Sequence, residues 1–460
     1  MAARTMKMLA LGLAGVGCVW VMAWSAGLGD RQTAIAQQDT WTTAEAQRLG
    51  VQLVEQRDAS GAPAYPVTPG DILFFTNSGT SYGSKNPKNS VVVIDARTKK
   101  PIAYSDLDPK YSANLGSHGI GMSLDAKYVY LPSMTSIPAA LNSTPAFVMT
   151  LDARTLKIHQ VTATGGTPHH AKAFRDGSGR SLVLIEHFNW GAPTSPGRGF
   201  YIVDPADHNK VIAGMSAGDL HGNPYSGFTT PDGRFLYYTV PPPSRGELGR
   251  EIPGWLAKID TSSWRVVQSL AVGHVPIWTE FSKDGRWAWV TNAGDNTVLK
   301  IERGQKPGER DKVVGEVATG GGPYGLRMNW DDTELWVADK GEIGPTGKTI
   351  TIVEPAAMKV KATVETGCLR NDHIIITPDG SEMWAMCNES HDIVVVDAKT
   401  HAIRHRIPMP NNGDVHGGIF VAYSRSGNGV VGEVVSDQNG LHGSALAAAM
   451  KRTAWTPPSR

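Results

Sequence analysis

The stretch WVTNAGDNTVLKIE, residues 289–302, contains the unit from which the whole fold is predicted. An alternating aromatic strand is followed by a glycine-containing turn and then by an apolar strand that ends in an acid. Strands of period two joined by tight turns are typical of antiparallel hairpins. The strand with a terminal acid recurs seven times along the chain, ending at Asp95, Asp152, Asp204, Asp260, Glu302, Glu354 and Asp397.

A second motif alternates with the first. It is a polar turn, usually with Asp and Gly, followed by an aromatic-rich strand, as in PDGRFLYYTV (231–240), KDGRWAWVTN (283–292) and PDGSEMWAM (378–386). Trp and Tyr at alternate positions suit packing between sheets. The two motifs together provide about four short strands per repeat, which is the size of a β-propeller blade.

Seven repeats predict an all-β, seven-bladed β-propeller with four-stranded blades over residues 71–436. Residues 72–78 look like the second strand of a blade and residues 416–424 like a first strand. We therefore expect the N- and C-terminal strands to close one blade together, which removes exposed sheet edges. Residues 37–70 are predicted to be an N-terminal extension and residues 437–460 a C-terminal tail. The repeat is similar to the YVTN-type propeller repeat, which implies this fold and says little about function.

The N-terminus has the pattern of an export signal. Arg4 and Lys7 precede an apolar run, and Ala34 and Ala36 are set as in an A-x-A cleavage site. We expect a signal peptide over residues 1–36 and a periplasmic protein. An uncleaved membrane anchor would also place the bulk of the chain outside the cytoplasm.

Charge and cysteine content exclude several classes of function. The formal net charge is +1 with no basic stripe, so we expect no nucleic-acid partner. Cys18 lies in the predicted signal, which leaves Cys368 and Cys387. These two could form a disulfide in an oxidising compartment or remain as buried thiols. No C-x-x-C metal motif or C-x-x-C-H haem-attachment motif is present.

Histidines recur in the segments that precede the polar turns. Six of these seven segments contain histidine, and the remaining one has Tyr324. Because the first strand of each propeller blade lines the central channel, these side chains are expected to meet around one axis. Their distances from the turn suggest two tiers, with His118, His169, His170 and His373 nearer the turn and His221, His274 and His416 farther from it.

The histidines could simply donate and accept hydrogen bonds in a wet channel. Converging imidazoles without a metal would repel one another when protonated, however, so a metal cluster is the preferred interpretation. Such a set of imidazoles exceeds the four ligands of one zinc ion and fits a multinuclear copper cluster best.

Several of these segments resemble those of the thiocyanate dehydrogenase family, namely GSHGIG, TPHHAKAF, GDLHGN, RNDHIII and GDVHGGI. That resemblance implies an exported propeller enzyme with three copper ions on its axis, which oxidises thiocyanate with water to cyanate and sulfur. The His169-His170 doublet is also similar to one in nitrous oxide reductase, so a nitrous-oxide-reductase-like copper enzyme that lacks the cupredoxin-type electron-entry domain is an alternative expectation.

The resulting hypothesis assigns roles to individual residues. The seven histidines are candidate metal ligands, and Asp219 or Asp414 would hold ligand histidines in orientation. Glu186 and Glu280 are candidate proton acceptors. An anionic substrate favours a nearby cation, for which Lys85 is the first candidate, followed by Arg327 and Arg370; Lys85 could equally lie in a solvated loop. A c-type cytochrome is the expected electron acceptor, and a homodimer is left open.

Two other classes compete with this hypothesis. A YVTN-like lactonase would use one divalent metal with acids and Asn around it, and the histidine count argues against that. A non-catalytic periplasmic binding propeller would have the same histidines merely lining its channel.

Overall fold

The computed structural model describes residues 41–79, 90–107, 111, 116–117, 119–134, 146–164, 166–188, 199–241, 252–306 and 308–452. The predicted signal peptide, Lys85 and His118 lie outside these residues. The described residues belong to one compact unit. None of the described helices is both long and apolar enough to cross a membrane.

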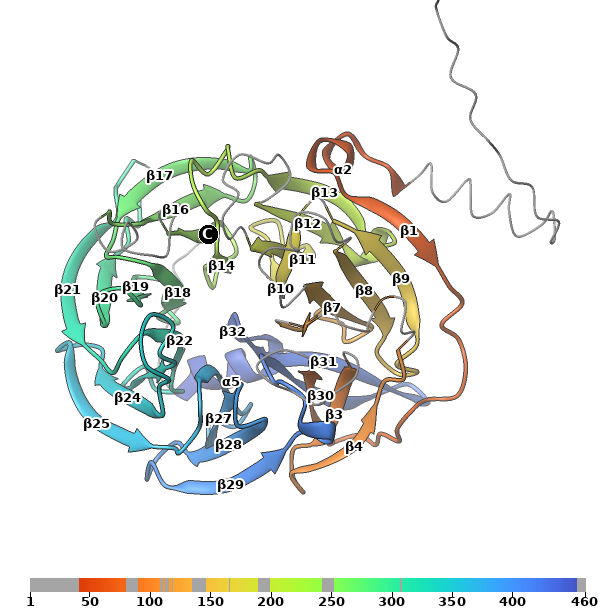
Figure 1. Ribbon diagram of the computed structural model, residues 1–460. Helices are drawn as coiled ribbons and strands as arrows, with labels where there is room; N and C mark the ends of the chain where they lie inside the picture. Colours follow the sequence, from red (N-terminus) through yellow and green to blue (C-terminus); the bar gives the residue numbers. More distant parts are fainter. Residues whose placement is uncertain are drawn as a thin grey trace, which may run out of the picture. The chain divides into compact units, whose positions relative to one another are not determined.

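Seven antiparallel sheets form a ring, which confirms the predicted seven-bladed β-propeller (Figure 1). In five sheets, four consecutive strands lie side by side. Two of these sheets comprise β10 (Thr167–Arg175), β11 (Ser181–Phe188), β12 (Phe200–Asp204) and β13 (Lys210–Met215), and β14 (Ser226–Thr229), β15 (Phe235–Val240), β16 (Trp255–Asp260) and β17 (Arg265–Ala271). The other three comprise β18 (Pro276–Phe281), β19 (Trp287–Asn292), β20 (Thr297–Glu302) and β21 (Lys312–Ala318), then β22 (Pro323–Met328), β23 (Leu335–Asp339), β24 (Thr349–Glu354) and β25 (Lys359–Glu365), and finally β26 (Asn371–Ile376), β27 (Glu382–Cys387), β28 (Asp392–Asp397) and β29 (Ile403–Pro408).

The repeated Asp-Gly pair makes the turn between the first two strands of a blade. Between β14 and β15, Asp232 Oδ1 accepts hydrogen bonds from Thr230 Oγ1 (2.6 Å) and the backbone N–H of Arg234 (3.2 Å). Gly233 has a φ of 68°, and a Cβ there would lie 1.8 Å from the carbonyl oxygen of Arg175. Only glycine fits this position, so both residues of the motif serve the backbone.

The aspartates that end five of the third strands are also structural. Asp260 Oδ1 accepts from the backbone N–H groups of Ser262 (2.9 Å) and Ser263 (3.0 Å), and Asp397 Oδ1 accepts from Thr400 in the same way (2.6 Å). These bonds fix the turn into the outermost strand. The most regular feature of the sequence therefore builds the fold and is not part of a site.

One blade is closed by the two ends of the propeller, as predicted. Its six strands run in the order β32-β31-β30-β2-β3-β4, and Phe74 of β2 lies opposite Phe420 of β30. The strands are β2 (Ile72–Ser78), β3 (Ser90–Asp95), β4 (Lys100–Tyr104), β30 (Gly418–Ser426), β31 (Gly429–Asp437) and β32 (Gly440–Leu441).

Both predicted flanking regions contribute elements to this unit. Strand β1 (Gln52–Gln56) adds to the outer edge of a sheet made of β5 (Gly116–Ser117), β6 (Gly121–Met122), β7 (Tyr128–Met134), β8 (Phe147–Asp152) and β9 (Ile158–Ala163), and helix α2 (Ala44–Leu49) lies against β13. At the other end, β31 and β32 lead into helix α5 (Gly443–Arg452) near the middle of the ring (Figure 1). Short 3-10 helices at Pro205–Asp207 and Pro410–Asn412 complete the described elements.

Cys368 and Cys387 form a disulfide, with their Cα atoms 5.2 Å apart. The sequence is compatible with a bridge or with two buried thiols, and the structure has the bridge. It joins the segment that leads into β26 to the end of β27.

Candidate metal centre

Four histidines from three separate parts of the chain meet at the axis of the propeller. His169 and His170 lie on β10, His373 lies on β26, and His416 precedes β30; all four are fully buried. Ring centroids are 3.7 Å apart for His169 and His170, 5.0 Å for His170 and His373, and 5.3 Å for His373 and His416. Ligand atoms of His170, His373 and His416 all lie within 4.8 Å of one another, and so do those of His169, His170 and Glu186.

A β-bulge explains how two adjacent histidines serve one site. Residues of a regular strand point alternately to opposite faces, but the pairing of β10 with β11 shifts between Pro168 and Ala171, where β10 has one extra residue. His169 and His170 occupy this bulge, which re-aims their side chains. The same shift occurs at the start of β18, β22 and β26, where the bulged residues are Ile277 and Trp278, Tyr324 and Gly325, and Asp372 and His373.

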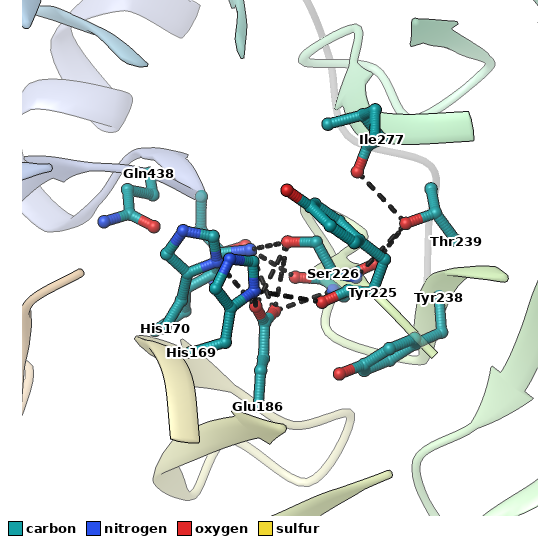
Figure 2. A network of polar contacts seen from close by, with 12 residues as sticks. His169, His170, Glu186, Tyr225, Ser226, Tyr238, Thr239, Ile277 and Gln438 are labelled. Carbon is teal, nitrogen blue, oxygen red and sulfur yellow. Dashed lines mark hydrogen bonds and ion pairs between the residues drawn. The ribbon is translucent and has the colours of Figure 1, made fainter. Parts of the chain in front are cut away.

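Hydrogen bonds at the Nδ1 atoms orient the rings of His169 and His170. His170 Nδ1 lies 2.9 Å from Glu186 Oε2, and His169 Nδ1 lies 3.3 Å from the carbonyl oxygen of Tyr225 (Figure 2). Both partners are acceptors, so each Nδ1 carries the proton. A metal on either ring would therefore bind Nε2, in the arrangement usual for histidine ligands oriented by a carboxylate or carbonyl.

Glu186 is itself fixed by a buried lysine. Lys172 Nζ lies 2.9 Å from Glu186 Oε1 and donates to Ser226 Oγ (2.6 Å), while the N–H of Gly227 donates to the same carboxylate (2.7 Å). Burial raises the pKa of Glu186 and lowers the pKa of Lys172 to about 8, with the ion pair opposing both shifts. Glu186 was predicted to accept protons; its position behind His170 instead suits it to orient that ring.

A second ion pair supports His416. Its Nε2 lies 2.7 Å from Asp372 Oδ2, and Lys340 Nζ lies 3.2 Å from Asp372 Oδ1. His416 Nδ1 accepts from the Asn388 amide (2.8 Å), whose orientation is set by a further bond to the carbonyl oxygen of Val415. Burial alone would raise the pKa of Asp372 and lower that of His416, but their mutual attraction reverses both shifts.

His373 has the environment of a metal ligand. Neither of its ring nitrogens has a hydrogen-bond partner among the described residues. The ring packs against Trp278 (centroids 4.7 Å apart) and stacks on Tyr324 (5.6 Å), whose hydroxyl lies 2.8 Å from that of Tyr225. Burial lowers the pKa of His373 well below its ordinary value, so the ring is neutral. Leaving a buried polar group unsatisfied costs about 1–3 kcal/mol, and a bound metal ion would remove that cost.

Three predicted metal-site residues do not lie in the described histidine cluster. His274 turns toward the β19–β20 turn, where Nδ1 lies 2.7 Å from Asp295 Oδ1. His221 is exposed in the turn after β13, and Asp219 in the same turn pairs with Arg48 of helix α2 (3.2 Å). Each of these residues lies in a loop whose local partners, and not the strand, decide where the side chain points.

Glu280 is buried on the innermost strand β18 but is separate from the histidines. Its Oε1 lies 3.2 Å from Arg327 Nη1 and accepts from the N–H of Met328 (3.1 Å). Both Glu280 and Arg327 line a cavity at the turn end of the strands together with Asn439 and His442. Because Glu280 pairs with Arg327, it is not part of the described histidine cluster.

Asp414 and Arg370, two further residues singled out by the sequence, also have local partners. Asp414 Oδ2 lies 3.8 Å from His416 Nδ1, which is too far for a hydrogen bond. Arg370 pairs with Glu389 (2.6 Å). His118 and Lys85 lie outside the described residues, so their predicted roles stay predictions.

Sequence reasoning missed Asp372, Lys172 and Lys340. Asp372 directly precedes His373 in the quoted segment RNDHIII, and Lys172 follows the doublet in TPHHAKAF. On a regular strand, Asp372 and His373 would point to opposite faces of the sheet. The sequence alone therefore did not place Asp372 beside the histidines, because this placement depends on the bulge. Lys340 follows the second strand of a repeat that has no histidine.

No known family model matches the chain, and no curated protein matches it in sequence. Among solved structures it is similar to a putative 6-phosphogluconolactonase from Bacteroides fragilis (TM-score 0.55, 14% identity, 78% of this chain and 100% of that chain). It is also similar to the periplasmic gluconolactonase of Pseudomonas aeruginosa (TM-score 0.53, 13% identity, 75% and 98%) and to the dihydro-heme d1 dehydrogenase NirN (TM-score 0.52, 17% identity, 82% and 81%). These likenesses support the propeller fold alone.

Proposed function

We propose that this chain is an exported copper oxidoreductase that oxidises thiocyanate at a histidine-ligated centre on the propeller axis. The observation that carries the proposal is the buried group of His170, His373 and His416, with all ligand atoms within 4.8 Å and with no hydrogen bond on either ring nitrogen of His373 among the described residues. The substrate follows from the resemblance of the histidine segments to the thiocyanate dehydrogenase family.

The donor set favours copper. The described centre offers imidazole nitrogens with two adjacent carboxylates, Asp372 and Glu186, and the disulfide removes Cys368 and Cys387 as thiolates. Imidazole suits copper, zinc, iron and nickel, and within this set copper supports the two-electron chemistry that the substrate requires. His169, His170 and His373 would hold the metal, and His416 would join them where a metal at Nε2 replaces the contact with Asp372, because Asn388 already donates to Nδ1. Three copper ions are expected once His118 is included.

The proposed reaction balances in atoms and electrons. Thiocyanate and water give cyanate, elemental sulfur, two protons and two electrons; a C–O bond forms, the C–S bond breaks, and sulfur is oxidised. Copper, when bound, would accept the electrons and make water acidic enough to ionise near neutral pH. A c-type cytochrome is the proposed external acceptor.

The residues around the histidines would orient the ligand rings and balance the buried negative charge, so that an anion can bind. Glu186 holds the Nδ1–H of His170, so the ring presents Nε2 in a fixed orientation. Lys172 and Lys340 balance the carboxylates of Glu186 and Asp372, which would otherwise repel an anionic substrate. Lys85 remains the proposed cation at the mouth of the channel.

Export is part of the proposal. The predicted signal peptide and the Cys368–Cys387 disulfide both suit an oxidising compartment such as the periplasm.

Copper quantification and an activity assay test the proposal directly. Purified protein loaded with copper and freed of loose metal should contain close to three copper ions per chain and show a copper optical spectrum. It should reduce cytochrome c only when thiocyanate is added. Protein that binds no copper would instead be a binding propeller, and copper-loaded protein without thiocyanate turnover would remove this substrate.

A further inference from the structure

The C-terminal segment passes directly beside the histidine cluster. Arg327, buried on β22, donates through Nη2 to the carbonyl oxygens of Asp437 (3.0 Å) and Gln438 (2.9 Å), and through Nε to that of Ile374 (3.3 Å). Glu280 holds the guanidinium from the other side. The backbone at Gln438 is therefore pinned to the innermost strands β22 and β26, and β26 also carries His373.

The Gln438 amide has one defined orientation. Its Nε2 donates to the carbonyl oxygen of Ile120 (3.3 Å), which can only accept, so Oε1 must face the other way. Figure 2 shows Oε1 pointing toward the ring of His170. Gln438 is 1% exposed, and Oε1 has no hydrogen-bond partner among the described residues.

A glycine makes room for this amide. A Cβ on Gly417 would lie 2.4 Å from Gln438 Nε2 and 3.3 Å from His373 Nδ1. The amide and the His373 ring therefore border the same small space, which any larger residue at position 417 would invade. A buried acceptor left unsatisfied costs about 1–3 kcal/mol, which points to a ligand that donates to it.

We propose that Gln438 is a catalytic residue of the centre, whose Oε1 accepts a hydrogen bond from the water molecule that attacks thiocyanate. This inference rests on the proposed function. A neutral amide oxygen accepts from the O–H of water, whereas thiocyanate has no hydrogen to give it. Gln438 would thus position the attacking water, whereas nearby cationic side chains would bind thiocyanate.

Three variants test this role in the full-length, copper-loaded protein. Gln438→Leu removes the acceptor at similar volume, Gln438→Glu keeps an acceptor but adds a charge, and Gly417→Ala pushes the amide aside without altering it. Ser444→Ala is the control, because Ser444 lies on the same C-terminal segment with an exposed hydroxyl that donates to Glu433 (3.1 Å).

Gln438→Leu should lower kcat by about tenfold to a hundredfold with little change in KM for thiocyanate, because the lost contact is made to water. Gly417→Ala should lower kcat in the same direction, and Gln438→Glu should keep more kcat than Gln438→Leu but raise KM. Proton ENDOR of the copper-loaded protein should show that exchangeable water protons near the metal change in Gln438→Leu and remain unchanged in Ser444→Ala.

Two results would overturn the inference while leaving the proposed function intact. One is wild-type kcat in Gln438→Leu with correctly folded, copper-loaded protein. The other is loss of copper from Gln438→Leu, which would make Gln438 a metal ligand. Absence of copper from the wild-type protein would overturn the proposed function itself, and this inference with it.

Discussion

The imidazole of His373 is the side chain on which the proposed centre depends most directly, because burial keeps it neutral and no described residue satisfies its nitrogens. His373→Gln should therefore lower copper content and thiocyanate-dependent rate together, each by more than about tenfold. The matched control is His221→Gln, an exposed histidine outside the described cluster, which should retain both. Metal analysis and cytochrome reduction measure the two quantities, and equal copper in the two variants would exclude His373 as a ligand.

Asp339, at the end of β23, stands where the YVTN-like repeat has Asn, and we expect its buried carboxyl group to lower stability at neutral pH. Burial raises its pKa from 3.8 to about 6, although Thr349 and Thr351 donate to Oδ2. The folded state then binds the proton more tightly than the unfolded state, so this contribution to stability is full below about pH 4 and is lost as pH rises through about 6.

Asp339→Asn should consequently stabilise the protein at pH 7 by roughly 2–3 kcal/mol, with the gain disappearing near pH 4. Chemical denaturation of both proteins at several pH values measures this difference. A variant that is less stable than the wild type at pH 7 would mean that the carboxylate is ionised and favourably paired in the folded state.

At the scale of single elements, the β-bulges decide which residues reach the axis. The sequence motifs predicted which strands are innermost, because each blade repeats the same turn chemistry, and they brought His169, His170, His373 and His416 to attention. A bulge depends on how two strands pair, which one strand does not reveal. The same limit explains why Asp372 was missed. His221 and His274 lie in loops, where Arg48 and Asp295 fix the local geometry.

The disulfide lies in the blade that contains β26 and β27. It ties the segment before β26 to the end of β27, and Asn371, the first residue of β26, pairs with Cys387. A loop closed over a sequence separation of 19 contributes about 3 kcal/mol in the chain-entropy description. The same tie holds the start of the strand that carries Asp372 and His373.

The double variant Cys368→Ser and Cys387→Ser should therefore lose about 3 kcal/mol of stability and bind copper more weakly. A thermal unfolding scan and competition with a copper chelator measure the two effects. Lower stability with unchanged copper affinity would mean that the bridge supports the blade without supporting the site.

For the whole molecule, the sequence predicted the ring and its closure because every blade uses the same chemistry. The path of the C-terminal segment was not predictable in the same way. Residues 437–441 have no counterpart in the repeat. Their position beside the axis depends on hydrogen bonds from Arg327 to their backbone, and no sequence pattern predicts these bonds. The part of the chain that was predicted to be a tail thus supplies the residue inferred to face the centre.

Closure of the ring rests on contacts between distant parts of the chain. Phe74 of β2 packs against Phe420 (4.6 Å between ring centroids) and Trp384 (4.8 Å), and it is fully buried. Thr76 of the same strand donates to the carbonyl oxygen of Gly417, next to His416. Loosening β2 therefore exposes two sheet edges and also disturbs a histidine of the centre.

Phe74→Ala should cost about 3–5 kcal/mol, as burial of a large aromatic residue implies. Trp336→Ala is the control, because Trp336 is equally buried in a blade formed by consecutive strands and should cost a similar amount. Only Phe74→Ala should also open the ring, which limited proteolysis would detect as early cleavage near β2, and release copper at denaturant concentrations that leave the rest folded. If both variants lose copper only on global unfolding, the β2–β30 seam is no weaker than the other blades, and closure does not control the centre.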